Sequence, residues 1–209
     1  LSTPPIALAQ ARSETRRMAR IAQEMVDETL LFLQDNDLKR ISGLEKKEEL
    51  TDILQKEITA FLVSLSQMSI SQETSREVAS MMNMVSDLER VGDHCENLWT
   101  LSQRKIEQKI AFSAVAMQEL AEISDLTSSF LATIIKALEA KDSEVYDEAQ
   151  RLEDAIDDLE EKLRANHIKR LNTGECTVNS GLIFIDMLHN FEKIGDHTFN
   201  LAKAVVGKK

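Results

Sequence analysis

Two twelve-residue stretches of this chain carry the same carboxylates, histidine and asparagine. Residues 87–98 read DLERVGDHCENL, and residues 190–201 read NFEKIGDHTFNL. Six positions are identical, namely Glu89/Glu192, Gly92/Gly195, Asp93/Asp196, His94/His197, Asn97/Asn200 and Leu98/Leu201. Carboxylates are hard oxygen donors that suit Mg²⁺, Ca²⁺, Mn²⁺ or iron. Cation binding is therefore the chemistry to consider first, and its repetition indicates a duplicated structural unit.

Both stretches lie in segments with helical apolar periodicity, so residues four apart share one face. The polar stripes predicted by this spacing are Glu89/Asp93/Asn97 and Glu192/Asp196/Asn200. A glycine inside a helix costs about 1 kcal/mol relative to alanine, yet Gly92 and Gly195 stand beside the acids in both copies. We expect these glycines to let another backbone or side chain approach the acidic face. Easier helix packing alone is the simpler alternative.

A second predicted helix in each half adds acids on one face. Glu153, Asp157 and Glu160 share a face in the second half, and Glu48 and Asp52 share one in the first. Carboxylates packed together without a cation repel one another and are costly to bury. One acidic stripe is usually hydrated, but four stripes, two of them tied to a repeated glycine, favour a metal. The predicted ligands are Glu89, Asp93, Glu192, Asp196, Glu153, Asp157, Glu48 and Asp52, with Asn97, Asn200 and Glu160 as supporting polar residues.

Other chemistry has less support. A ferritin-like di-metal oxidase needs Glu-x-x-His on two helices, and only Asp186/His189 has a related spacing, once. On a helical wheel His94 and His197 lie away from the acids, so we expect them to make a structural hydrogen bond. No glycine-rich phosphate loop or nucleophile elbow is present. We expect no catalytic activity.

The composition predicts an all-α protein, because the 209 residues include only 6 Gly and 2 Pro. The periodicity predicts six long helices, at about residues 6–33, 44–67, 72–109, 111–140, 143–171 and 178–206. The first three match the last three in order and rough length. We therefore expect two tandem three-helix bundles related by internal duplication, residues 1–109 and 110–209. Asp142 and Thr177 are predicted N-caps, and Ser42 with Glu45 has a capping-box pattern.

The charge and the cysteines limit the function further. A net charge of −11 disfavours nucleic acid, because binding there relies on Lys and Arg neutralising phosphates. Two cysteines make no disulfide framework and indicate a reducing compartment, and no apolar run approaches the ~20 residues of a membrane span. A basic run on the first helix comprises Arg12, Arg16, Arg17 and Arg20. The simpler interpretation is that these arginines form a hydrated surface. The alternative is that they form a docking surface for a partner.

The doubled motif, ERVGDHCEN at residues 89–97 and EKIGDHTFN at residues 192–200, resembles the signature of the PhoU family. The resemblance covers nearly the whole chain, since that family has two three-helix repeats. It implies E(D)xxxD clusters that bind multinuclear iron or other metals, with Zn, Mn, Mg and Ca as alternatives. On this sequence the clusters are Glu89/Asp93 and Glu192/Asp196, with Glu153/Asp157 on the partner helix. Glu48/Asp52 fits less well, because Gln55 stands where the second half has Glu160.

The start of the chain, LSTPPIALAQARSETRRMA, resembles the linker entering a PhoU domain appended to a sodium/phosphate cotransporter. The chain begins with Leu1, so we expect a piece of a longer protein. We therefore expect a regulatory domain of inorganic phosphate uptake at the cytoplasmic side of the membrane. Its partner would be a phosphate transporter in the same polypeptide, and it could also form homo-oligomers. The alternatives are a free-standing regulator of a phosphate ABC transporter and its sensor kinase, or a helical interaction module with hydrated acids.

Overall fold

Six long helices make up the protein in a computed structural model that describes residues 3–140 and 142–207. Their bounds are α1 Pro4–Asp35, α2 Ile41–Ser66, α3 Gln72–Glu107, α4 Ala114–Ala140, α5 Tyr146–Asn172 and α6 Val178–Val205. A short 3₁₀ helix, η1, spans Leu38–Arg40. The described ranges contain no strand. The predicted all-α class with six long helices is confirmed.

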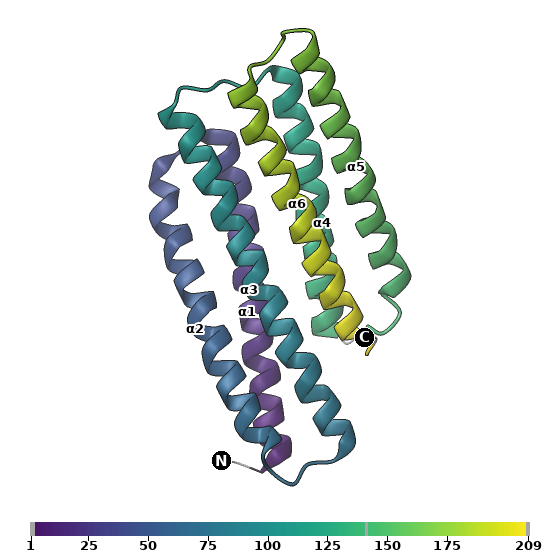
Figure 1. Cartoon of the computed structure of the whole chain (residues 1–209). Coiled ribbons are helices and arrows are strands. Elements are labelled where there is room, and N and C mark those ends of the chain that lie inside the picture. Colours follow the sequence, from purple (N-terminus) through teal and green to yellow (C-terminus); the bar gives the residue numbers. More distant parts are fainter. Residues whose placement is uncertain (1–2, 141, 208–209) are drawn as a thin grey trace.

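The helices form two three-helix bundles that lie side by side (Figure 1). Helices α1, α2 and α3 pack on one another, and so do α4, α5 and α6. The bundles meet where α3 packs along α6 and α1 along α4, so that α2 and α5 lie at the outer edges (Figure 1). The predicted two-bundle architecture is confirmed, whereas the division between residues 109 and 110 stays a prediction. None of the described helices has both the length and the apolar character that a bilayer crossing needs.

Side-chain caps fix where several helices begin. Ser71 accepts a hydrogen bond from the backbone N–H three residues on, at the start of α3. Thr177 caps α6 as predicted, and Ser180 completes a capping box by accepting from the N–H of Thr177. Asp142 caps only a turn, since α5 itself begins later, at Tyr146. The prediction that Asp142 is the N-cap of α5 is therefore wrong, because the helix begins about one turn later.

The predicted capping box of Ser42 and Glu45 is also wrong. Helix α2 begins at Ile41, and Arg40 before it already has right-handed helical backbone angles. An N-cap residue normally sits outside the helix with extended angles, so that its side chain can reach back to a free N–H. Here η1 runs directly into α2, so Ser42 already lies inside the helix.

Apolar arcs opposite the acids hold each motif helix in its bundle. Two sets of side chains are buried: Leu88, Val91, Cys95 and Leu98 on α3, and Phe191, Ile194, Thr198 and Leu201 on α6. Burying one Leu or Phe side chain fully contributes roughly 1.5–3 kcal/mol. These arcs fix the rotation of both helices, and with it the direction of the acidic faces.

The two motif glycines are points of close helix approach. A Cβ added at Gly195 would lie 3.2 Å from Cδ1 of Ile156 on α5, and one at Gly92 would lie 3.3 Å from Oγ1 of Thr51 on α2. Both distances are shorter than ordinary carbon contacts of roughly 3.5–4.0 Å. The glycines therefore let a side chain of the neighbouring helix approach the motif, which fits the simpler alternative of helix packing as well as the expected approach to the acidic face. Because Asp157 follows Ile156 directly, this contact brings the acids of α5 towards those of α6.

We expect Gly195→Ala to destabilise the fold by about 1 kcal/mol, although alanine favours a helix. Overpacking against Ile156 costs typically 1–3 kcal/mol, and the gain in helix propensity offsets about 1 kcal/mol of it. In an Ile156→Val background, which lacks Cδ1, the same substitution should become neutral or stabilising. Urea unfolding of the four variants gives the coupling energy. Strict additivity, with Gly195→Ala stabilising in both backgrounds, would contradict the close contact.

Candidate metal centre

Three carboxylates of the second half converge between α5 and α6. Oxygens of Glu153, Asp157 and Asp196 all lie within 4.8 Å of one another. Within residues 3–140 and 142–207, no other group of three Asp, Glu, His or Cys side chains is as close. Glu153 and Asp196 are half-buried, and Asp157 is exposed. The structure thus brings together three of the eight predicted ligands at the spacing that one cation can bridge.

Burial and neighbouring negative charges disfavour the simultaneous ionisation of these three carboxyl groups. Burial raises the pKa of Glu153 above its ordinary value, and the neighbouring Asp157, Asp154 and Asp196 raise it further. Asp157 is exposed as a whole residue, but partial burial of its carboxyl group raises its pKa, with the charges of Glu192 and Asp196 adding to the effect. Each cause disfavours the ionised form. The cluster is therefore stabilised by protons or by a cation.

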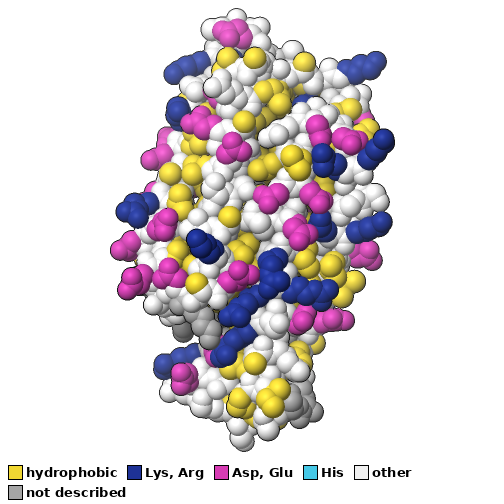
Figure 2. All heavy atoms as spheres, turned by 180° about the vertical axis from the view of Figure 1, so that it is seen from behind, with side chains coloured by type: hydrophobic (Ala, Val, Ile, Leu, Met, Phe, Trp, Pro, Cys, Tyr) yellow, Lys and Arg dark blue, Asp and Glu magenta, His cyan; other side chains and the backbone are white. Residues whose placement is uncertain are grey.

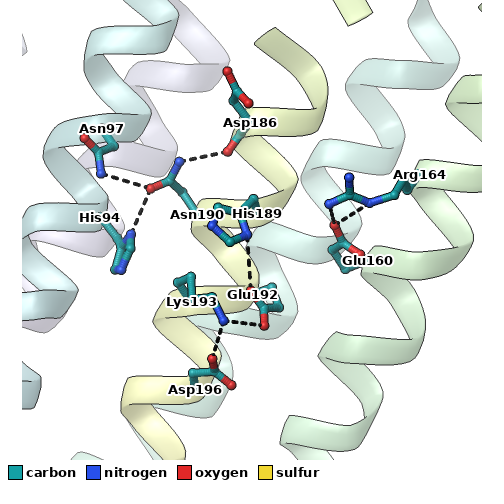
Figure 3. Close-up of polar contacts among 10 residues, drawn as sticks. All are labelled: His94, Asn97, Glu160, Arg164, Asp186, His189, Asn190, Glu192, Lys193 and Asp196. Atoms are coloured by element: carbon teal, nitrogen blue, oxygen red, sulfur yellow. Dashed lines mark hydrogen bonds and ion pairs between the residues drawn. The ribbon is translucent and has the colours of Figure 1, made fainter. Parts of the chain in front are cut away.

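Lys193 already supplies part of the compensating charge (Figure 3). Its Nζ donates to Oε1 of Glu192 at 3.0 Å and to Oδ2 of Asp196 at 2.7 Å. These bonds raise the pKa of Lys193 above its usual value. Arg90 takes the same place in the first half, but its nitrogens lie 3.8 and 3.6 Å from the two acids there. A metal ion in the second half would therefore share Asp196 with this ammonium group.

The first half gathers its acids more loosely. Burial raises the pKa of Glu48, and Glu96, Asp52 and Asp93 raise it further. The pKa of Glu89 is raised by burial first and by Asp93 second. The predicted ligands of α2 and α3 thus face one another. No three of them reach the spacing of the second-half cluster within the described residues.

Glu96 belongs to this first-half group, although the repeated motif does not predict it. It is the largest charge contribution to the raised pKa of Glu48 after burial. The repeat comparison gave no signal, because Phe199 stands at the matching position of the second motif. The only available signal was its position three residues after Asp93, which is also a neighbouring position on a helix.

Asn97 and Asn200 do not support the acids. Asn97 donates to Oδ1 of Asn190 at 3.2 Å, and Asn200 donates to Oδ1 of Asp87 at 3.3 Å, each across the α3–α6 contact. The predicted stripe fails for a geometric reason. With 3.6 residues per turn, a residue eight positions on has rotated by about 80°, so Asn97 has turned away from Glu89 towards the other half.

The repeated histidines make the structural hydrogen bonds expected of them. Nδ1 of His94 donates to Oδ1 of Asn190 at 2.8 Å (Figure 3), and Nδ1 of His197 donates to Oδ1 of Asp87 at 2.9 Å. The two rings stack with centroids 5.5 Å apart. His94 and His197 therefore lie at the join between the halves, where each motif helix recognises the other.

Glu160 lies apart from the acid cluster. Arg164, one turn further along α5, donates from Nε to Oε1 of Glu160 at 2.9 Å (Figure 3). A local partner at i+4 satisfies this carboxylate. Its predicted supporting position at the metal centre therefore has no support in the observed contacts.

The chemistry of the donors fits a hard cation. Glu153, Asp157 and Asp196 offer oxygen ligands only, the set that Mg²⁺, Mn²⁺, Ca²⁺ and iron accept. Cys95 lies apart from this donor set, because it is fully buried in the apolar arc of α3, where burial raises its pKa to about 12. Zinc, which favours nitrogen and sulfur ligands in structural sites, fits this donor set less well.

Comparison with known proteins gives one family. The family model described as PhoU domain matches this chain twice, over residues 15–101 and 120–205. The chain is 26% identical to "Phosphate-specific transport system accessory protein PhoU homolog 1" of Thermotoga maritima, covering 95% of this chain and 85% of that protein. It is 21% identical to "Putative inorganic phosphate export protein YjbB" of Escherichia coli, covering 99% of this chain but only 38% of that protein.

Two solved structures share the fold. The crystal structure of PhoU from Pseudomonas aeruginosa superposes with a TM-score of 0.90 at 19% identity, covering 97% of this chain and 96% of that chain. That of the phosphate transport system regulatory protein PhoU from Streptococcus pneumoniae gives 0.85 at 20% identity, covering 98% and 95%. At this identity the likeness shows the six-helix architecture alone.

We expect a divalent cation to stabilise chelator-treated protein, and Asp157→Asn to abolish the effect. At a hundredfold excess over the dissociation constant, binding to the folded state contributes about 2.7 kcal/mol, a rise in Tm of roughly 5–10 °C. Thermal unfolding with and without Mn²⁺ or Fe²⁺ measures this rise. Asp158→Asn is the matched control, because Asp158 is the next residue on α5 and lies outside the cluster. Equal metal responses of both variants would exclude Asp157 as a ligand.

Without metal, we expect the cluster to destabilise the protein as the pH rises. A raised pKa means that the folded state holds protons that the unfolded state has lost, so stability falls as pH passes through the raised values. In chelator, Asp157→Asn should therefore gain stability relative to wild type as the pH rises above about 4, the ordinary pKa of an aspartate. Denaturant unfolding across this range gives the difference. A difference independent of pH, or one equal to that of Asp158→Asn, would argue against repulsion at Asp157.

Proposed function

The chain belongs to the PhoU domain family, and from this premise we propose that it regulates inorganic phosphate transport by binding to a transporter. The observation that carries the proposal is the pair of PhoU domain matches, which occupy most of both bundles. Relatives matched over nearly their whole length are titled as phosphate-specific transport accessory proteins. A regulator needs surfaces and a stable fold rather than a reaction centre, so the proposed role is non-catalytic.

The acids of α5 and α6 are the proposed metal centre of this regulator. Glu153, Asp157 and Asp196 would hold the ion, and Glu192 lies close enough to Asp157 to affect its pKa. The bound ion supplies the positive charge that these carboxylates lack, and the carboxylates in turn hold α5 against α6. Iron, in a multinuclear cluster, is the metal that the family resemblance favours. Mn²⁺, Mg²⁺, Ca²⁺ or Zn²⁺ are the alternatives.

The transporter could be a separate protein or part of the same polypeptide, and different relatives support each arrangement. Relatives such as the Thermotoga maritima homologue, matched over 85% of its length, favour a regulator that binds a separate transporter. The Escherichia coli protein titled as a putative phosphate exporter contains a similar segment within a longer chain, of which 38% is matched. That match supports the second candidate, a regulatory domain joined to a phosphate-transporting polypeptide such as a sodium/phosphate cotransporter.

We expect removal of this chain to release phosphate uptake from restraint. In the source organism, deletion of its coding segment should raise the uptake of radiolabelled phosphate severalfold in phosphate-rich medium. Expression of the chain in trans should restore the restraint, and detergent extracts should contain it bound to a phosphate transporter. Unchanged uptake at both high and low external phosphate would contradict the proposal. Restraint of uptake that the chain restores only when it is fused to the transporter would favour the joined arrangement.

A further inference from the structure

A large groove opens beside the end of the second bundle, and none of the three clustered acids lines it. Its volume is about 1200 Å³, and its walls come from α1 and α3, with the C-terminal ends of α4 and α6 closing one side. Small-molecule sites usually measure roughly 300–1,000 Å³. The size of this groove therefore suits a segment of polypeptide better than a small ligand.

The groove exists because the two bundles are offset along their helix axes. Ser80 of α3 donates to the backbone oxygen of Ala204, one residue before α6 ends, and Arg20 of α1 pairs with Glu139, one residue before α4 ends. The earlier parts of α1 and α3 continue past these points (Figure 1). For α3 this is two turns, about 11 Å of helix. On this flank, no described helix takes the place that α4 and α6 occupy further along.

The charge of the groove is opposite to that of the chain. Four cationic side chains line it, namely Arg12, Arg16, Arg76 and Lys203, against two carboxylates, Glu77 and Asp87. The chain as a whole carries a net charge of −11. Figure 2 shows Lys and Arg side chains gathered across the lower half of the α1 and α4 face.

Both carboxylates in the groove already have partners, whereas two arginines do not. Arg12 forms an ion pair with Glu77, and Asp87 accepts from His197 and Asn200. Arg16 and Arg76 form no ion pair with any described residue. Arg16 is half-exposed and lines the wall of the groove.

The floor of the groove is apolar and adaptable. Met81 and Met84 line it with exposures of 4% and 7%, and Leu138 of α4 adjoins them. Methionine side chains adjust to partners of different shape and recur at surfaces that bind helices. An apolar floor with charges along its walls is the arrangement that binds an amphipathic helix in a groove.

We infer that this groove binds an acidic amphipathic helix of a partner protein. The apolar side of the helix would lie on Met81 and Met84, and its carboxylates would pair with Arg16, Arg76 and Lys203. The helix would take the packing position that α4 and α6 leave open. Of the basic run on α1, Arg16 would then contact the partner helix. Arg17 pairs with Glu14 and would remain hydrated surface. The inference rests on the proposed function only in expecting that the partner belongs to a transport system.

The test uses a fluorescent synthetic helix of about 14 residues, roughly 21 Å long, with leucine and alanine on one face and glutamate on the other. Its counterpart carries lysine in place of every glutamate. We expect fluorescence anisotropy to show binding of the acidic peptide alone to the whole chain, weakening with salt. Arg16→Glu should weaken binding at least about tenfold. Arg17→Glu, the same change at the next residue, should alter it less than about twofold.

Three results would each overturn the inference. These are no binding of the acidic peptide, equal binding of its lysine counterpart, and equal effects of Arg16→Glu and Arg17→Glu in variants with matching Tm. Displacement of the peptide by inorganic phosphate, but not by sodium chloride of equal ionic strength, would assign the groove to a small oxyanion instead. The uptake experiment is independent of these results, so loss of the groove and loss of the transport function can be told apart.

Discussion

The structure depends on one electrostatic constraint, the confinement of like charges between neighbouring helices. Ile156 packs so closely against Gly195 that a Cβ there would lie 3.2 Å from its Cδ1, and this contact holds Glu153 and Asp157 of α5 near Asp196 of α6. Burial and mutual repulsion then raise the pKa values of Glu153 and Asp157. A fold that keeps such acids together needs either bound protons or a compensating cation. Lys193 provides one ammonium group, and the proposed metal ion would supply the rest.

The repeated motif performs two tasks on two sides of one helix. Its acids face α2 in the first half and α5 in the second, while its histidine and asparagine face the other half. His94 with Asn190, and His197 with Asp87, therefore join the bundles where α3 packs along α6. This join fixes which way both acidic faces point. The halves are related but unequal, because Lys193 binds its acids closely and Arg90 does not.

Much of this could be read from the sequence, because periodicity and duplication report on helices directly. The six helices, their pairing into two bundles and the facing acids of α5 and α6 were predicted. The errors have local causes. Asn97 was placed with the acids because steps of four residues drift round a helix by about 40° each. Glu160 has its own partner in Arg164, and Glu96 has no counterpart in the second motif. The groove depends on the offset of the bundles, which no local pattern encodes.

A crystal grown with Mn²⁺ or Fe²⁺, with data collected at the absorption edge of that metal, tests the central claim most directly. The account predicts an anomalous difference peak between α5 and α6, at bonding distance from oxygens of Glu153, Asp157 and Asp196. Side chains in the same positions with no peak, and Lys193 still bound to Asp196, would show that the ammonium group alone compensates the acids. That result would contradict a metal centre and leave the acidic face hydrated.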